Sequence, residues 1–230
     1  MEAIILAGGR GTRLRDVVPD LPKPMAQVAG RPFMEIILTL LSRQGFRRVV
    51  ISLGYMAEKV VSHFGGHFAG MELEYVIEDS PLGTGGAVRV ALEKIINDHV
   101  FVFNGDTYID VEVKKVEKHW LAHRAPIIVA QEVSNTSRYG RLETVNNRVL
   151  GFSEKGLSGP GLINAGCYVL PKNILDEFPC GVAFSLEENF LVTAVVQQNF
   201  DVFVNKGQFI DIGIPEDYEL AQNKLAGLFA

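Results

Sequence analysis

Short apolar, β-branched segments alternate with longer amphipathic segments over the first 131 residues of the chain. The short segments predict strands at Glu2–Leu6, Arg48–Leu53, Leu73–Ile77, Val100–Phe103 and Ile127–Gln131. The amphipathic segments predict helices at Pro32–Gln44, Ala57–Phe64, Gly85–Ile96 and Val113–His123. This alternation is typical of an α/β fold, so we expect a three-layer αβα sandwich around a mixed, mostly parallel central sheet.

The alternation weakens after residue 132. Strands are predicted at Arg141–Val145, Val149–Ser153 and Leu162–Leu170, and helices at Ser185–Gln198 and Pro215–Leu228. No linker composition separates the two parts. We therefore expect a single domain over residues 1–230, with a first half of about 1–132 and a second half of about 133–230.

Composition and charge narrow the class of protein. Hydrophobic residues make up 47% of the chain and charged residues 21%, which is typical of a globular protein. The net charge of −5 argues against a nucleic-acid-binding protein, which usually needs a basic face. No apolar run reaches the ~20 residues of a membrane span, and no signal peptide is evident. The two cysteines form no disulfide framework, so a cytoplasmic location fits best.

The strongest candidate for chemistry is the loop after the first predicted strand, residues 8–13, which is rich in glycine and arginine. Glycines let several backbone N–H groups face one ligand, and arginine suits phosphate. The loop lacks the third glycine of a dinucleotide fingerprint and the Gly-Lys-Ser/Thr of a Walker A loop. Farther on, Pro22 and Pro24 are expected to hold Lys23 in an extended conformation, where it could make a fixed phosphate contact.

Together these segments, followed by Gly83-Thr84-Gly85-Gly86, Asn104-Gly105-Asp106, Glu154-Lys155 and Asp211-Ile212-Gly213, resemble the sugar-1-phosphate nucleotidylyltransferases. Members of that family join a nucleoside triphosphate to a sugar 1-phosphate and release pyrophosphate. The resemblance implies their Rossmann-like nucleotide-diphospho-sugar transferase fold. It also implies a nucleotide site built from Leu6, Ala7, Gly8, Gly9, Gly11, Thr12, Arg13, Lys23, Gly83, Thr84, Gly85 and Asn104.

The same resemblance implies that Asp106 and Asp211 hold Mg²⁺, and that Arg13, Lys23, Lys155 and Asp106 are the catalytic residues. The implied sugar-phosphate site comprises Gly105, Tyr139, Gly140, Glu154, Lys155, Asn164 and Glu187. Glu216 and Asp217 are interpreted as structural charges in the first turn of a helix. The five histidines are interpreted as single side chains with surface or structural roles.

Within the family, the chain resembles the guanylyltransferases for D-glycero-α-D-manno-heptose 1-phosphate in its short length, its Gly-Thr-Gly-Gly loop and its Asn-Gly-Asp segment. The GDP-heptose that those enzymes make is used in bacterial surface polysaccharides. Three alternatives stay open at this point: a mannose-1-phosphate guanylyltransferase, a uridylyltransferase for N-acetylmuramic acid 1-phosphate and a glucose-1-phosphate thymidylyltransferase. A non-catalytic sensor is the alternative from another class. The expected partners are GTP, or another nucleoside triphosphate, and the sugar 1-phosphate; a homo-oligomer is compatible with the sequence.

Overall fold

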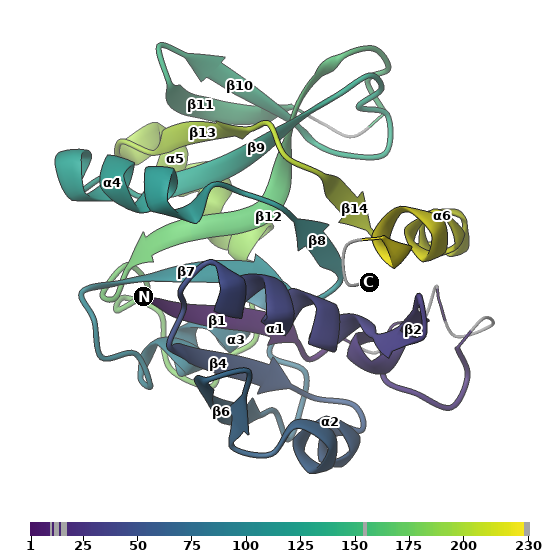
Figure 1. Ribbon diagram of the computed structural model, residues 1–230. Helices are drawn as coiled ribbons and strands as arrows, with labels where there is room; N and C mark the ends of the chain where they lie inside the picture. Colours follow the sequence, from purple (N-terminus) through teal and green to yellow (C-terminus); the bar gives the residue numbers. More distant parts are fainter. Residues whose placement is uncertain (10, 12–13, 15–17, 154–155, 228–230) are drawn as a thin grey trace.

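The computed structural model describes residues 1–9, 11, 14, 18–153 and 156–227. Most of the strands belong to one large sheet (Figure 1). They are β1 (Glu2–Ala7), β4 (Arg48–Leu53), β5 (His67–Phe68), β6 (Met71–Ile77), β7 (His99–Asn104), β9 (Ile127–Val133), β10 (Arg141–Val145), β11 (Arg148–Ser153), β12 (Gly161–Pro171) and β13 (Asp201–Asn205). Their order across the sheet is β10-β11-β13-β9-β12-β7-β1-β4-β6-β5. Two small pairs lie beside it, β2 (Gln27–Val28) with β3 (Arg31–Pro32), and β8 (Thr107–Ile109) with β14 (Phe209–Asp211).

A parallel core formed by β6, β4, β1 and β7 positions the glycine-rich loop. β1, β4 and β7 are rich in Val, Ile and Phe and are almost fully buried, as expected for parallel strands covered on both faces, whereas β6 is only partly buried. In the register of β1 and β7, Leu6 lies opposite Asn104. The carboxyl ends of the two strands therefore meet at one edge of the sheet, where open α/β sheets bind ligands.

The second half of the chain extends the same sheet through an antiparallel strand. β12 lies antiparallel between β7 and β9, and β13 pairs parallel with β9. The predicted mixed sheet with helices is confirmed, and β6, β4, β1, β7, β9 and β13 share one direction. The predicted open sandwich does not describe the far end of the sheet, because Arg141 of β10 also pairs with Ile163 of β12. The strands from β12 to β10 thus curl back on themselves.

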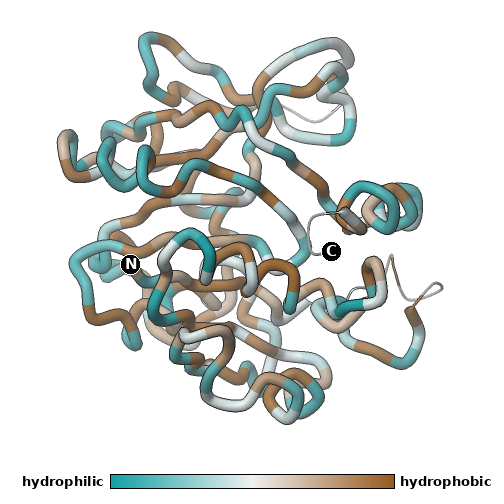
Figure 2. Tube along the Cα trace, viewed as in Figure 1, coloured by the Kyte–Doolittle hydropathy of each residue, from teal (hydrophilic) through white to brown (hydrophobic). Residues whose placement is uncertain are grey.

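Helices cover both faces of the sheet. One face packs against α1 (Phe33–Arg43), α2 (Ala57–Phe64), α4 (Val113–His123) and α6 (Pro215–Ala226). The other packs against α3 (Gly83–Leu92), η3 (Leu186–Leu191) and α5 (Val192–Gln197). Figure 2 shows hydrophobic positions concentrated along the central strands and hydrophilic ones on the outer loops. Within the residues described, no helix is both long enough and apolar enough to cross a membrane.

The predicted elements differ from the structure in three informative places. Lys23 begins a short 3-10 turn, η2 (Lys23–Met25), rather than lying in an extended segment. The predicted helix over 185–198 is divided into the π-helical turn η3 and the α-helix α5. The strands β13 and β14 were not predicted, and β14 is only three residues long.

Candidate active site

A cavity of about 350 Å³ opens at the carboxyl ends of β1 and β7. It gathers eleven of the predicted site residues on one surface: Leu6, Ala7, Gly8, Gly9, Gly11, Lys23, Gly83, Thr84, Asn104, Gly105 and Asp106. Pro24, Glu78, Pro81, Ala87 and Gly213 complete the lining. Thr12, Arg13, Glu154 and Lys155 lie outside the described residues.

Glu78 is a lining residue that sequence reasoning missed. Its carboxylate accepts hydrogen bonds from Ser52 Oγ and from the backbone N–H of Leu82, both at 2.9 Å. A Cβ added to Gly8 would lie 2.3 Å from Glu78 Oε1, so glycine lets the first loop approach this carboxylate without displacing it. Glu78 thus joins β4 to the segment leading into α3, beside the first glycine loop. Its place directly after the parallel strand β6 is the signal that could have indicated it.

Lys23 and Asp106 form an ion pair inside the cavity. Lys23 Nζ lies 2.5 Å from Asp106 Oδ2, and the two side chains are 13% and 35% exposed. Lys23 comes from η2, and Asp106 follows the buried strand β7. The pair places a cation and a carboxylate side by side where the phosphates of a nucleotide could lie, which suits both anion and cation binding.

Asp211 stands beside Asp106 because β8 and β14 pair. Asp211 lies opposite Thr107 in that ladder, and the N–H of Ile212 donates to the backbone carbonyl of Asp106 at 2.9 Å. Burial raises the pKa of Asp211 above its ordinary 3.8, and the negative charge of Asp106 raises it further. A hydrogen bond from the N–H of Gly213 opposes the shift in part. Two carboxylates forced together in this way favour a bound cation.

The raised pKa of Asp211 predicts that Asp211→Asn stabilises the metal-free protein at neutral pH. A carboxyl whose pKa is raised on folding costs stability as the pH rises from the unfolded value of 3.8 through the folded value, and the full cost remains above it. Asparagine removes this charge and keeps an oxygen for the N–H of Gly213. We expect the Tm in EDTA to rise by a few degrees at pH 7.5, with the difference disappearing below pH ~3.8.

Thermal unfolding of the Asp211→Asn variant and of Asp79→Asn, an exposed neighbour of Glu78, measures this effect. Asp79→Asn should leave the Tm unchanged. An equal or lower Tm for Asp211→Asn at pH 7.5 would show that burial and the neighbouring Asp106 do not make the Asp211 charge costly in the folded protein.

A hydrogen-bonded chain connects the second glycine loop to the predicted sugar side. Thr84 Oγ1 donates to Glu187 Oε2 at 2.7 Å and accepts from the N–H of Leu186 at 2.9 Å. Tyr168 Oη donates to Glu187 Oε1 at 3.3 Å, and Asn164 Nδ2 donates to Tyr168 Oη at 2.7 Å. Burial raises the pKa of Tyr168 far above its ordinary value, so its phenol stays protonated and can donate. The chain fixes η3 against the cavity wall.

Replacing Thr84 by valine should therefore destabilise the protein. Valine keeps the shape but leaves the carboxylate of Glu187 and the N–H of Leu186 without this partner. We expect a loss of about 1–3 kcal/mol in the free energy of unfolding, measured by urea denaturation. Thr193→Val, at an exposed threonine of α5, is the matched control and should change stability little. Equal stabilities for the two variants would contradict a structural role for the Thr84–Glu187 bond.

The side chain of Asn104, a residue of the cavity lining, contains a hydrogen-bond acceptor that lacks a donor within the described part of the chain. Its Oδ1 is buried and has no hydrogen-bond partner among the residues described. A Cβ on Gly166 would lie 2.3 Å from Asn104 Nδ2, so the amide is held closely from the β12 side. Because a buried acceptor without a partner is costly, this oxygen is suited to accept a hydrogen bond from a ligand donor.

Six of the predicted residues that the structure describes lie outside the cavity lining: Asp211, Asn164 and Glu187, described above, and Gly85, Tyr139 and Gly140. Gly85 packs under Phe184, whose ring carbon lies 2.1 Å from a Cβ built on Gly85, so its small size serves packing in this structure. Tyr139 lies close enough to Asp211 for that charge to help raise its pKa, after burial, and its ring contacts Phe209 with centroids 6.4 Å apart. Gly140 lies beside the carbonyl of Ser153. Asp217, predicted as structural, accepts a hydrogen bond from Arg138 at 2.7 Å.

The arrangement combines a glycine-lined cavity, a fixed lysine and two adjacent carboxylates. It offers no nucleophile paired with a base among the lining residues. Such a site can bind and orient polyanions and stabilise charge during transfer at phosphorus, where positioning and electrostatics carry the catalysis.

Comparison with known proteins agrees with this chemistry. The family model described as "Nucleotidyl transferase" matches residues 2–227. The D-glycero-alpha-D-manno-heptose 1-phosphate guanylyltransferase of Aneurinibacillus thermoaerophilus is 41% identical over 226 residues, covering 98% of both chains. The enzyme of the same name from Campylobacter jejuni is 38% identical, covering 95% of this chain and 97% of its own.

Among solved structures, HddC from Yersinia pseudotuberculosis is 39% identical, with a TM-score of 0.87 over 97% of this chain and 99% of its own. HddC has also been solved in complex with GMP-PN. The cavity at the strand ends, the paired carboxylates and these matches over nearly the whole chain lead to one conclusion. The chain belongs to the nucleotidyl transferase family and has the fold of its sugar-1-phosphate nucleotidyltransferase enzymes.

Proposed function

We propose that the chain transfers a guanylyl group from GTP to D-glycero-α-D-manno-heptose 1-phosphate. The products are GDP-heptose and pyrophosphate, and the nucleotide sugar serves the synthesis of bacterial surface polysaccharide. The observation that carries this choice is the full-length similarity to two enzymes with that name. The HddC complex with GMP-PN supports a nucleotide as a ligand of this chain.

The nucleotide is assigned to the half of the chain over about residues 1–132. Gly8, Gly9 and Gly11 would face its phosphates, and Thr84 and Asn104 its nucleoside. The buried, unpartnered Oδ1 of Asn104 supports this assignment, because a ribose hydroxyl or a base N–H could donate to it. Thr12 and Arg13 complete the proposed nucleotide site, with Arg13 holding the β- and γ-phosphates.

The sugar phosphate is assigned to the half over about residues 133–230. Glu187 and Asn164, which belong to the hydrogen-bonded chain through Tyr168, would contact the sugar. Gly105, Tyr139 and Gly140 would flank the paired carboxylates. Lys155 would orient the phosphate of the sugar, and Glu154 would accept hydrogen bonds from its hydroxyls. Both halves contribute strands to one sheet, which supports a single domain over 1–230.

Mg²⁺ is the cation that we propose for Asp106 and Asp211. Their carboxylate oxygens are the hard ligands that Mg²⁺ prefers beside phosphates. Burial, and after it the charge of Asp106, raises the pKa of Asp211, so a cation beside the two carboxylates would stabilise the ionised form of Asp211. When bound, the ion would neutralise charge on the α-phosphate and on the incoming sugar phosphate. Asp106 and Asp211 would act by holding it in place.

Lys23 has a role separate from that of the carboxylates. Its ammonium, fixed by Asp106, would contact the α-phosphate and stabilise the charge that develops there. No general base is required, because a sugar 1-phosphate with a second pKa of about 6 is mostly dianionic near pH 7. The oxygen of the sugar phosphate can therefore attack directly while pyrophosphate leaves.

A substrate matrix tests the proposal. GTP, ATP, UTP and dTTP are each combined with heptose, mannose, glucose and N-acetylmuramic acid 1-phosphates, and pyrophosphate release is measured with the purified chain alone. We expect the highest kcat/KM for GTP with the heptose 1-phosphate. A preference for mannose 1-phosphate would replace the proposed sugar, activity only with UTP or dTTP would overturn the guanylyl assignment, and no release with any pair would favour a sensor.

A further inference from the structure

Two histidines of α4 and an aspartate of β13 converge on one point away from the cavity. His119 Nε2 lies 2.7 Å from Asp201 Oδ2, and His123 Nδ1 lies 2.8 Å from the same oxygen. The two ring nitrogens are 3.0 Å apart. His119 and His123 are four residues apart on a helix, so they share a face one turn from each other. The sequence-based interpretation of the histidines as single side chains missed this grouping.

The separations of 2.7, 2.8 and 3.0 Å are slightly shorter than those of atoms bound to one ion. A ligand atom at ~2.1 Å from Zn²⁺, with 90° between ligands, lies about 3.0 Å from its neighbour, and about 3.4 Å in a tetrahedron. The three observed separations are close to the lower value, so shifts of a few tenths of an ångström would admit an ion. No larger rearrangement of α4 or β13 is required.

The chemistry of the three groups selects the kind of ion. Two imidazoles and one carboxylate are typical ligands of Zn²⁺ and neighbouring transition ions, whereas Mg²⁺ prefers oxygen ligands alone. Asp201 and His119 are 13% and 20% exposed and His123 is 54% exposed, so the group is fixed on one side and accessible on the other. Arg124, the next residue after His123, has its charge paired with Asp98 at 2.8 Å.

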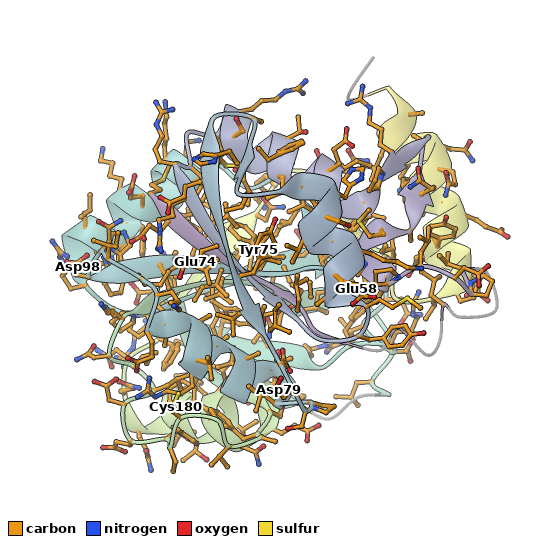
Figure 3. The ribbon with its side chains drawn as sticks, turned by 90° about the horizontal axis from the view of Figure 1, so that it is seen from below. Glu58, Glu74, Tyr75, Asp79, Asp98 and Cys180 are labelled. Atoms are coloured by element: carbon orange, nitrogen blue, oxygen red, sulfur yellow. The ribbon has the colours of Figure 1, made fainter. Side chains whose placement is uncertain are left out.

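The cluster lies at the opposite edge of the sheet from the nucleotide cavity. β13 runs in the same direction as β7, and Asp201 is its first residue, so the cluster lies at the amino ends of these strands. The cavity lies at the carboxyl ends of β1 and β7. The ion pair between Arg124 and Asp98 places the end of α4 beside the start of β7. Asp79 follows β6 close to the cavity, and Figure 3 shows that Asp98 lies well apart from it. None of the three residues lines the cavity.

We propose that His119, His123 and Asp201 form a binding site for a divalent transition ion, with Zn²⁺ as the best match, which ties the end of α4 to the start of β13. The site takes one ion through three protein atoms, with water in the remaining positions. Because α4 and β13 are separated by 77 residues of chain, ion binding would stabilise the packing of the second half of the sheet. The site is independent of the proposed transferase reaction.

Zn²⁺ titration of the full chain, in competition with a chromophoric chelator, tests the site. To remove binding by the catalytic carboxylates, the titration uses an Asp106→Asn/Asp211→Asn background. We expect one Zn²⁺ per chain, and a loss of at least about tenfold in affinity on His123→Ala, since even ligand-supporting residues cost that much. His123 is exposed near the helix end, so its removal should leave the fold intact.

His63→Ala, at an exposed histidine of α2, is the matched control and should bind Zn²⁺ like the parent. Zn²⁺ should also raise the Tm of the parent and of His63→Ala, and not that of His123→Ala. Co²⁺ should give visible absorption bands that the His123→Ala change removes. The absence of stoichiometric Zn²⁺ binding, or equal affinities for the parent and His123→Ala, would overturn the proposal and leave the three groups as a hydrogen-bonded cluster.

Discussion

Asp106→Asn is expected to lower kcat for pyrophosphate release by at least about 1,000-fold, which corresponds to about 4 kcal/mol in the barrier. Asparagine keeps the size of the side chain but removes the charge that would hold the cation beside the phosphates. The change also takes away the anionic partner of Lys23 Nζ. Asp211→Asn should cause a loss of the same scale, because the two carboxylates are proposed to hold one ion.

Steady-state kinetics with saturating nucleotide and sugar 1-phosphate measures the loss. Asp79→Asn, at an exposed aspartate close to the cavity but outside its lining, is the control and should retain normal turnover. For Asp211→Asn, the Tm in EDTA and the kcat should change in opposite directions: the variant should be more stable than the parent without metal and yet inactive. Its loss of activity could then not be explained by unfolding. A variant that kept more than about a tenth of the parental kcat would refute the carboxylate assignment.

Lys23→Ala is expected to lower kcat by about 100- to 1,000-fold, the usual effect of removing one fixed donor from a developing oxyanion. The ammonium is largely buried and fixed against Asp106, so water cannot replace it in the same position. If Lys23 acts mainly on the transition state, kcat should fall far more than the KM for nucleotide rises.

Lys59→Ala is the matched control for this experiment. Lys59 Nζ donates to the carbonyl of Asp20 at 2.7 Å on the loop that precedes Lys23, and the bond is exposed. Its loss would perturb that loop without removing a charge from the cavity. Similar kinetic effects of the two variants would mean that Lys23 acts by holding the loop rather than on the phosphate.

Local patterns were sufficient to predict several elements with their bounds, most of them in the first half of the chain. The strands at Arg48–Leu53 and Arg141–Val145 and the helices at Ala57–Phe64 and Val113–His123 have the predicted bounds. Their apolar periods are unambiguous, and helix packing on the sheet agrees with local propensity. The helix α3 begins at Gly83, two residues before its predicted start, because the segment at Phe184 packs against its first turn.

Contacts between distant residues explain what the pattern could not predict. Asp106 and Asp211 meet because the three-residue strands β8 and β14 pair, and such short strands carry too little periodicity to be recognised. Glu78 reaches the cavity through its bond to the N–H of Leu82, which depends on how β6 leads into α3. His119 and Asp201 are likewise joined only when α4 packs beside β13.

The most direct test of the central claim is the appearance of GDP-heptose from GTP and D-glycero-α-D-manno-heptose 1-phosphate, followed by ³¹P NMR with the purified chain. We expect the sugar-phosphate signal to be replaced by two coupled diphosphate signals as pyrophosphate accumulates. We also expect the conversion to stop in EDTA, to resume with excess Mg²⁺ and to be undetectable with Asp106→Asn over the same period. Conversion that continues in EDTA, or a parent that converts UTP or dTTP but not GTP, would contradict the proposed function.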